Sequence, residues 1–174
     1  NSNESGIVNI YKIPVACGKP VALTQSKDNA TRLTDVFPHD DRILFERDKG
    51  GNEKYHLFVR TLDGTEQDLT PMAETMEAHF TGWSADGLSF YVSTNERDAK
   101  AFDIYRYDAK TYARTLIFEN TTGMQTQGIS PDGRWIVSSK INTTADSDIF
   151  LYDIQSKQMK NISAHTGVAN NQVA

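Results

Sequence analysis

Residues 129–163 read ISPDGRWIVSSKINTTADSDIFLYDIQSKQMKNIS, and this stretch decides the fold. It contains short runs rich in β-branched and aromatic residues, WIVSSK and DIFLYDI, separated by polar segments. Such runs are typical of β-strands. Pro131, Asp132 and Gly133 fit the central and last positions of a type I turn. The stretch therefore predicts consecutive strands joined by hairpins.

The same pattern occurs in two earlier segments, which begin at Phe37 and at Trp83. Their leading apolar residues and Ile129 are spaced 46 residues apart, twice. Two further sets of apolar anchors recur with nearly the same spacing. The most apolar strand starts at Ile10, Leu57, Ile104 and Ile149, and each unit closes at Leu23, Leu69, Ile117 and Ile162. Three independent anchors with one period indicate a true repeat.

Each unit is predicted to form four short antiparallel strands. In the third strand of the last unit, Ile149 and Leu151 point to one face while Phe150 and Tyr152 point to the other. A hairpin-connected sheet with two apolar faces must lie between two similar sheets. Four-stranded units of about 40 to 50 residues that stack face to face are β-propeller blades. The chain shows neither the period of a helical fold nor the irregular spacing of a β-sandwich.

The predicted fold class is all-β, with about three complete propeller blades and two partial ones. We expect residues 1–27 to end one blade, residues 28–73, 74–120 and 121–165 to form three more, and residues 166–174 to start the next. An open set of blades leaves a sheet face and strand edges exposed. We therefore expect this fragment to self-associate, with two copies completing a ring of about eight blades. A stable monomer in sedimentation would contradict this expectation.

Composition excludes several functions. The 174 residues carry a net charge of −5 and contain no basic run, which argues against a nucleic-acid partner. No stretch approaches the length of apolar chain that crosses a membrane, so no membrane partner is expected. The single Cys17 cannot form an internal disulfide or a thiolate zinc site. The cellular compartment is left open by the sequence.

Two Gly-x-Ser stretches, at Ser84 and Ser130, raise the question of a catalytic nucleophile. The nucleophile elbow of a serine hydrolase needs Gly-x-Ser-x-Gly, because both glycines permit its strained turn. The residue two positions after each serine is instead an aspartate, Asp86 or Asp132. We predict that both serines belong to tight hairpins. No catalytic, cofactor-binding or metal-binding residue is expected in the chain.

The remaining polar candidates receive structural interpretations. Four dispersed histidines are predicted to be surface or turn residues: His39, His56, His79 and His165. Asp146 and Asp148 are interpreted as solvated loop acids rather than cation ligands. Residues 95–98, NERD, are placed in the loop after the second strand of their blade, with Glu96 and Arg97 interpreted as members of a loop ion pair.

Several longer stretches resemble the propeller of prolyl oligopeptidase-family serine peptidases, in the acylaminoacyl-peptidase and dipeptidyl-peptidase-like branch. They are FPHDDRILFERDKGGNE from Phe37, GWSADGLSFYVSTNERD from Gly82 and DIYRYDAKTYARTLIFEN from Asp103. The resemblance implies an α/β-hydrolase domain elsewhere, whose active site the propeller covers so that only small or flexible peptides enter. A propeller acid binds the substrate amino terminus in related dipeptidyl peptidases, but no motif carries that role to Glu96.

Two function hypotheses follow. The first is a non-catalytic propeller fragment that scaffolds and gates a serine peptidase domain downstream, with that domain and its peptide substrates as partners. The second is a TolB-like non-enzymatic propeller that binds a protein, because the short Ser-Pro-Asp-Gly repeat also occurs in that class. No Gly-x-Ser-x-Gly occurs in the chain, so we expect no peptidase activity and no cofactor in this segment itself.

Overall fold

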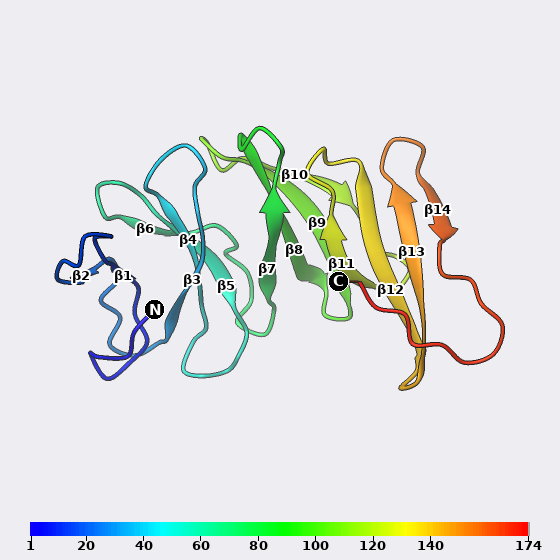
Figure 1. The fold of residues 1–174 in the computed structure, drawn as a ribbon, viewed down its shortest axis with the longest axis horizontal. Helices are drawn as coiled ribbons and strands as arrows, with labels where there is room; N and C mark the ends of the chain where they lie inside the picture. Colours follow the sequence, from blue (N-terminus) through cyan, green and yellow to red (C-terminus); the bar gives the residue numbers. More distant parts are fainter. Residues whose placement is uncertain (174) are drawn as a thin grey trace. The chain divides into compact units, whose positions relative to one another are not determined.

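The computed structural model describes residues 1–173, which form fourteen β-strands and no helix (Figure 1). None of these residues provides a helix that is long and apolar enough to span a membrane. The chain divides into two compact units, with the boundary between His79 and Phe80. The all-β prediction is therefore confirmed.

The first unit contains a two-stranded sheet and one complete four-stranded sheet. The small sheet pairs β1 (Tyr11–Lys12) with β2 (Val21–Ala22). The larger sheet is an antiparallel meander of β3 (Thr31–Val36), β4 (Ile43–Arg47), β5 (His56–Arg60) and β6 (Glu66–Asp68).

Apolar residues on one face of this larger sheet pack against the chain around the small one. Ile10, Ile43 and Phe45 are buried together, with Leu23 and Phe58 packed against them. The rings of Phe45 and Phe58 stack with centroids 5.3 Å apart. Such aromatic pairs contribute about 0.5 to 1.5 kcal/mol beyond simple burial.

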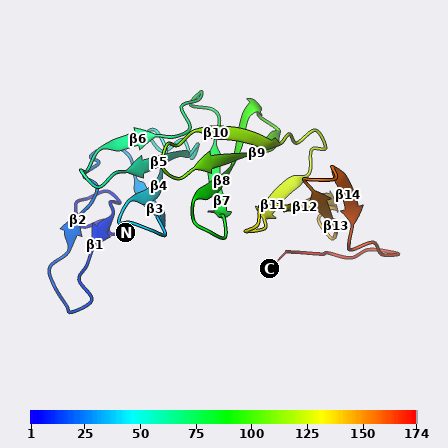
Figure 2. The same ribbon diagram turned by 90° about the horizontal axis from the view of Figure 1, so that it is seen from above.

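The second unit contains most of the next four-stranded sheet and all of the last one. The former consists of β7 (Ala78–Trp83), β8 (Ser89–Asp98), β9 (Ala101–Asp108) and β10 (Arg114–Phe118). The latter consists of β11 (Gln125–Ile129), β12 (Trp135–Thr143), β13 (Asp146–Asp153) and β14 (Gln158–Asn161). Each sheet is a meander in which consecutive strands are neighbours, as Figure 2 shows from above.

The two sheets of the second unit share one apolar core. Tyr91, Ile104 and Phe118 come from β8, β9 and β10, and they are buried together with Ile136 of β12. Tyr152 of β13 packs against the same cluster. The opposite face of β9 is also buried, since Tyr107 is only 1% exposed and stacks on Phe90 at 5.1 Å. The core shared by these two sheets confirms the predicted packing of sheet against sheet.

The predicted tight hairpins are present at both Gly-x-Ser stretches. The N–H of Gly87 donates to the Ser84 carbonyl at 2.9 Å, and the N–H of Gly133 donates to the Ser130 carbonyl at 2.8 Å. Both glycines have a positive φ, 67° and 70°. Glycine adopts this conformation without the steric cost that a side chain would add.

The hairpins correct the alignment of the first repeat. Each is closed by one backbone hydrogen bond, which runs from Phe37 to Arg42, from Ser84 to Ser89 and from Ser130 to Trp135. Phe37 therefore corresponds to the two serines, and Val36 corresponds to Trp83 and Ile129. The apolar character of Phe37 had suggested a register one residue away. Turn hydrogen bonding, rather than hydrophobicity, fixes the register here.

Two segments predicted as loops are extensions of hairpin strands. Residues 95–98 belong to β8, and Asp98 still pairs with Ala101 of β9. Asp146 and Asp148 belong to β13, and Thr143 pairs with Asp146. In both hairpins the register shifts near the tip. A β-bulge absorbs the extra residue, so that polar sequence continues the ladder where the pattern predicted a loop.

The partial repeats at the two ends have few strand pairs. At the amino-terminal end, only β1 and β2 form a sheet, with an isolated bridge between Ser2 and Asn9. At the other end, residues 166–173 form no named strand, and Asn170 makes an isolated parallel bridge with Ser147. The proposed limits of each blade remain predictions.

The Ser130 hairpin provides a test of packing within the second unit. A Cβ added to Gly133 would overlap the hydroxyl oxygen of Tyr91, and Tyr91 is only 3% exposed. Gly123 has a similar φ of 67°, but a Cβ there meets nothing within 4 Å. Both substitutions carry the backbone cost of about 1 kcal/mol. We expect Gly133→Ala to lower the free energy of unfolding by about 1 to 3 kcal/mol more than Gly123→Ala in urea denaturation. Equal losses would contradict the predicted overlap.

Candidate functional site

One polar position recurs in all four copies of the repeat, directly before the second apolar anchor. We call this the clasp position, because its side chain forms hydrogen bonds with segments that lead into or out of the neighbouring strands. It is occupied by Asn9, His56, Asp103 and Asp148. Asn9 and Asp103 are fully buried, at 1% and 0% exposure. Buried polar groups need hydrogen-bond partners, so these residues fix the local path of the chain.

A hydroxyl accompanies the clasp position in three copies. The backbone N–H of Ile10 donates to Thr24 Oγ1 at 2.9 Å, and that of Leu57 donates to Thr70 Oγ1 at 2.9 Å. The N–H of Ile149 donates to Ser163 Oγ at 2.7 Å. In each case the hydroxyl lies just beyond the strand that closes the repeat. The chain leaving that strand is thus held against the start of the preceding one.

In the sheet of β7 to β10 the clasp is ionic. Arg97 donates to Asp103 from Nε at 2.7 Å and from Nη2 at 2.8 Å. The N–H of Asn120 also donates to Asp103, at 2.7 Å. The carboxylate raises the pKa of Arg97 above its usual value, chiefly through these hydrogen bonds. The side chain of Arg97 is therefore committed to holding the β8–β9 hairpin against the segment after β10.

The neighbouring Glu96 points to different partners. Its carboxylate accepts a hydrogen bond from Arg114 at 2.9 Å. Burial, and then a hydrogen bond with Glu96, raises the pKa of Tyr105 to about 12. The guanidinium of Arg114 also lies 4.7 Å from the centre of the Tyr105 ring. Glu96 and Arg97 thus belong to two separate ion pairs within strand β8, where the sequence had predicted one ion pair in a loop.

The hydroxyls of Ser84 and Ser130 close their hairpins. Ser84 Oγ donates to Asp86 at 2.7 Å and accepts from the N–H of Ser89 at 2.9 Å. Ser130 Oγ likewise bonds to Asp132 and accepts from the N–H of Trp135. These hydroxyls bond to carboxylate and backbone groups, whereas a nucleophilic serine bonds to a general base.

The histidines occupy varied places. His39 lies in an exposed turn, as predicted. His56 and His79 are instead in strands β5 and β7, where His56 lies 3.1 Å from Asp68 and His79 lies 3.5 Å from Glu77. Asp68 belongs to the neighbouring strand β6, whereas Glu77 lies two residues before His79 in the chain. No group of three or more histidine, cysteine or acidic residues within residues 1–173 is arranged to hold a metal ion.

His165 joins the two aspartates at the tip of the β12–β13 hairpin. Its Nε2 lies 2.9 Å from Asp146, and its Nδ1 lies 3.6 Å from Asp148. Asn142 donates to both carboxylates, at 3.2 and 3.0 Å. Asp146 and Asp148 are thus hydrogen-bonded strand residues rather than the solvated loop acids of the prediction.

The same cluster holds the segment that follows β14. The N–H of Ala169 donates to Asp146 at 3.2 Å, and Ser147 Oγ accepts from the N–H of Asn171 at 2.9 Å. A hydrogen bond to the Ser163 carbonyl and then one to Asp146 raise the pKa of His165. The segment is therefore attached by polar contacts, one of which carries a titratable charge.

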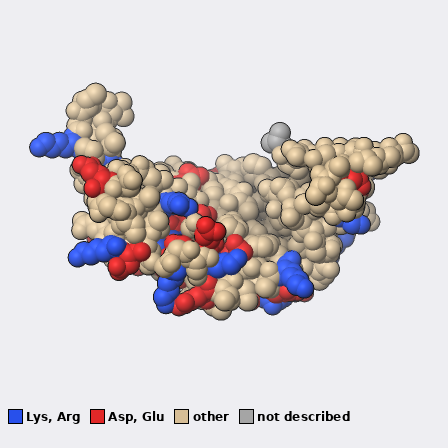
Figure 3. Space-filling view, turned by 90° about the horizontal axis from the view of Figure 1, so that it is seen from below, with Lys and Arg blue, Asp and Glu red and all other residues tan. Residues whose placement is uncertain are grey.

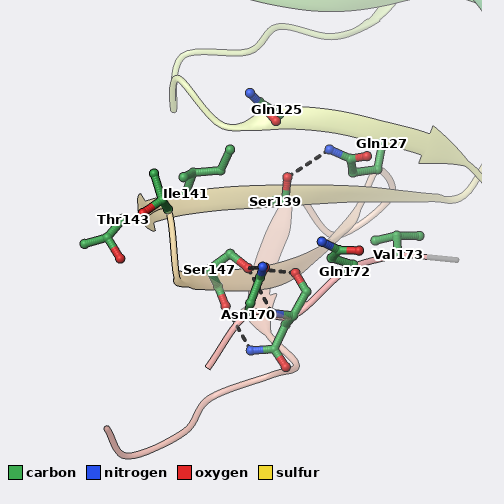
Figure 4. A pocket seen from close by; sticks show the side chains of 11 residues that line it. Gln125, Gln127, Ser139, Ile141, Thr143, Ser147, Asn170, Gln172 and Val173 are labelled. Atoms are coloured by element: carbon green, nitrogen blue, oxygen red, sulfur yellow. Dashed lines mark hydrogen bonds between the residues drawn. The ribbon is translucent and has the colours of Figure 1, made fainter. Parts of the chain in front are cut away.

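This segment forms one wall of a pocket of about 500 Å³ (Figure 4). Gln125 and Gln127 of β11 line another wall, with Ser139 of β12 hydrogen-bonded to Gln127 at 2.9 Å. All eleven lining residues are uncharged: Gln125, Gln127, Ser139, Ile141, Thr143, Thr144, Ser147, Asn170, Asn171, Gln172 and Val173. Neutral amides and hydroxyls can bind polar groups such as peptide units, but they supply no strong acid or base. Sequence reasoning missed this pocket; the amide-rich run ANNQ, residues 169–172, was its only signal.

Charge on the surface is mixed. Lysine and arginine lie beside aspartate and glutamate on the face drawn in Figure 3. Together with the net charge of −5, this distribution does not favour a polyanionic partner.

The ionic clasp predicts a local sensitivity to substitution. Asp103→Asn keeps the shape but removes the charge that holds Arg97, so we expect the free energy of unfolding to fall by about 2 to 4 kcal/mol. Asp98→Asn is a matched control in the same hairpin, since Asp98 is exposed and its carboxylate accepts a hydrogen bond from the N–H of Lys100 at 3.0 Å. We expect the control to change stability by less than about 0.5 kcal/mol. Similar losses from both substitutions would contradict the assigned role of Asp103.

The His165 cluster predicts a dependence on pH. Because the pKa of His165 is raised in the folded protein, its contribution is complete below the unfolded value of about 6.5 and is lost as pH rises through the folded pKa. We expect hydrogen exchange at Ala169 and Asn171, corrected for intrinsic rates, to accelerate through that range. His165→Gln should remove this acceleration, because glutamine does not titrate. An unchanged pH profile in the variant would overturn the prediction.

Two dipeptidyl peptidases are similar to the chain in sequence. Dipeptidyl aminopeptidase BIII of Pseudoxanthomonas mexicana is 34% identical over 119 residues, which cover 66% of the chain and 17% of that protein. A probable dipeptidyl peptidase 4 of Aspergillus fumigatus is 24% identical over 117 residues, covering 66% of the chain and 15% of that protein. The chain thus spans less than a fifth of the relatives it matches.

Solved structures share the fold. An oligogalacturonate lyase in complex with manganese has a TM-score of 0.67 at 13% identity, covering 91% of this chain and 42% of the lyase. A prolyl endopeptidase has a TM-score of 0.64 at 16% identity, with coverage of 91% and 26%. A putative TolB from Agrobacterium tumefaciens has a TM-score of 0.58 at 17% identity, with coverage of 91% and 57%. These similarities concern the fold alone.

No family model matches the chain. The repeated four-stranded sheets nevertheless agree with the propeller folds of the solved structures, and the sequence relatives are peptidases. The chain is therefore similar in sequence to a segment of dipeptidyl peptidases, and it shares its fold with a prolyl endopeptidase.

Proposed function

We propose that the chain is a non-catalytic part of a dipeptidyl-peptidase-like propeller, which supports and gates an α/β-hydrolase domain carried elsewhere in a longer protein. The observation behind this proposal is the 34% identity with dipeptidyl aminopeptidase BIII over 119 residues. The partners in this proposal are the hydrolase domain and the peptides that reach its active site.

The local chemistry supports a binding role rather than a catalytic one. The sequence contains no Gly-x-Ser-x-Gly, and Ser84 and Ser130 use their hydroxyls to close hairpins. The neutral pocket beside β11 offers hydrogen bonds without an ionisable lining residue. Such a surface suits contact with uncharged peptide groups passing through a propeller, and it leaves bond cleavage to another domain.

A protein-binding propeller is the second candidate, because the putative TolB shares the fold with a TM-score of 0.58. The two candidates differ in one chemical group. A peptidase requires an activated serine on the same polypeptide, whereas the TolB-like alternative does not.

A fluorophosphonate probe for activated serines tests the proposal. We expect the probe to label the longer protein and to leave the isolated 174-residue chain unlabelled. Ser130→Ala in the longer protein should remain fully labelled, while its stability falls by about 1 kcal/mol through loss of the hairpin hydrogen bonds. Ser84→Ala is the matched variant, because it removes the equivalent hydroxyl from the other hairpin. Absence of labelling in the longer protein would favour the TolB-like candidate, and labelling of the isolated chain would refute a non-catalytic role.

A further inference from the structure

The clasp position of the first complete sheet differs from the other three. His56 occupies it, and its Nδ1 lies 3.1 Å from Asp68 Oδ2. Its other ring nitrogen, Nε2, has no hydrogen-bond partner within the part of the chain that the structure describes. The side chain is only 14% exposed. The imidazole of His56 can therefore form one further hydrogen bond, through Nε2.

The other copies show what a purely structural clasp requires. Asn9 accepts from Thr24 and Ser26 and donates to the carbonyl of Ser26. Asp148 accepts from Asn142 and Asn161, and Asp103 accepts from three donor atoms. The repeat therefore supplies its own comparison: three side chains are engaged on every functional atom, and the histidine is not.

A cavity of about 330 Å³ lies where His56 is found. Arg47 is directly opposite His56 in the β4–β5 pair, so the two side chains share one face of the sheet. Phe58 and Met72 give the cavity an apolar wall. A volume of this size suits a small molecule.

Arg47 also has a spare donor. Its Nη2 donates to Glu66 at 2.8 Å and its Nε donates to Thr31 at 3.2 Å, which leaves Nη1 without a partner among residues 1–173. The guanidinium lies 5.0 and 5.2 Å from the ring centres of Phe45 and Phe58. Its orientation is therefore fixed before any ligand arrives.

The acids that line the cavity already have partners. Asp68 bonds to His56 and Thr70, Asp48 accepts from the N–H of Glu53 at 3.1 Å, and Glu74 pairs with Lys49. The cations Lys49 and Lys54 are paired as well. The polar atoms that remain unused are Nη1 of Arg47 and Nε2 of His56. Donors of this kind, fixed beside an apolar wall, select a planar anion that carries an apolar substituent.

We propose that this cavity binds a small carboxylate with an apolar side chain. Arg47 Nη1 donates to one carboxylate oxygen, and the Nε2–H of His56 donates to the other. Asp68 accepts from Nδ1 and keeps the ring in place. The substituent packs against Phe58 and Met72. The site is independent of the peptidase assignment, because it rests on residues of the first unit alone.

Nuclear magnetic resonance of the histidine side chains tests the proposal in the whole chain. The probe is N-acetyl-leucine near pH 6, and N-acetyl-leucinamide is the matched neutral compound. We expect a saturable shift of the His56 imidazole nitrogens with a millimolar dissociation constant, and at least about tenfold weaker binding of the amide. His39, His79 and His165 are internal controls that should stay unchanged. Equal binding of acid and amide, equal shifts at all four histidines, or no saturable shift would each overturn the proposal.

Two substitutions separate binding from folding. His56→Asn retains a side chain that can donate to Asp68 but lacks the second ring nitrogen, and Arg47→Lys retains the charge but lacks the planar fork. We expect each to weaken N-acetyl-leucine binding by about tenfold, measured by calorimetry for the histidine variant and by the His56 signal for the other. Arg60→Lys is the control, since Arg60 lies in β5 and outside the cavity lining. Unchanged affinity in both folded variants would exclude this site.

Discussion

The chain that leaves each fourth strand must be held against the start of the third, and a few buried or partly buried hydrogen bonds do this. Thr24, Thr70 and Ser163 accept from the backbone at equivalent points, 2.7 to 2.9 Å away. Without these contacts the connection would leave polar groups buried and unpaired, at a cost of about 1 to 3 kcal/mol each. Apolar contacts bury the faces of the sheets, whereas the clasp hydrogen bonds fix the point at which one repeat ends and the next begins.

Sequence patterns could predict the sheets because their cause is periodic. The residues Leu57, Ile104 and Ile149 recur with similar spacing, and the first two are fully buried in the third strands of their sheets. Turn chemistry was equally readable at Gly87 and Gly133, where a positive φ requires glycine or a costly substitute. Apolar spacing and turn residues are local signals, and both correspond directly to local backbone geometry.

Contacts between distant polar residues were not readable in the same way. The sequence placed Glu96 and Arg97 in a loop, because a polar run gives no sign that a bulge will extend β8 as far as Asp98. It also treated His56 and Asp68 separately, although pairing of β5 with β6 brings them to 3.1 Å. Phe37 misled the alignment since its burial comes from the turn that it begins, with Arg42 4.0 Å above its ring. Such side chains gain their partners only after strands have paired.

Apolar anchors and clasp residues differ in how freely they can be replaced, and this difference affects where a propeller can acquire a new function. An apolar anchor such as Ile104 is 0% exposed and packs on several neighbours, so changing it costs the fold itself. The clasp position needs only some polar group that can bond to the departing chain, and here it is asparagine, histidine or aspartate. The constraint is one of hydrogen bonding rather than of charge or volume. A propeller can therefore alter its chemistry at the clasp end of one blade, as with His56, while every sheet keeps the same packing.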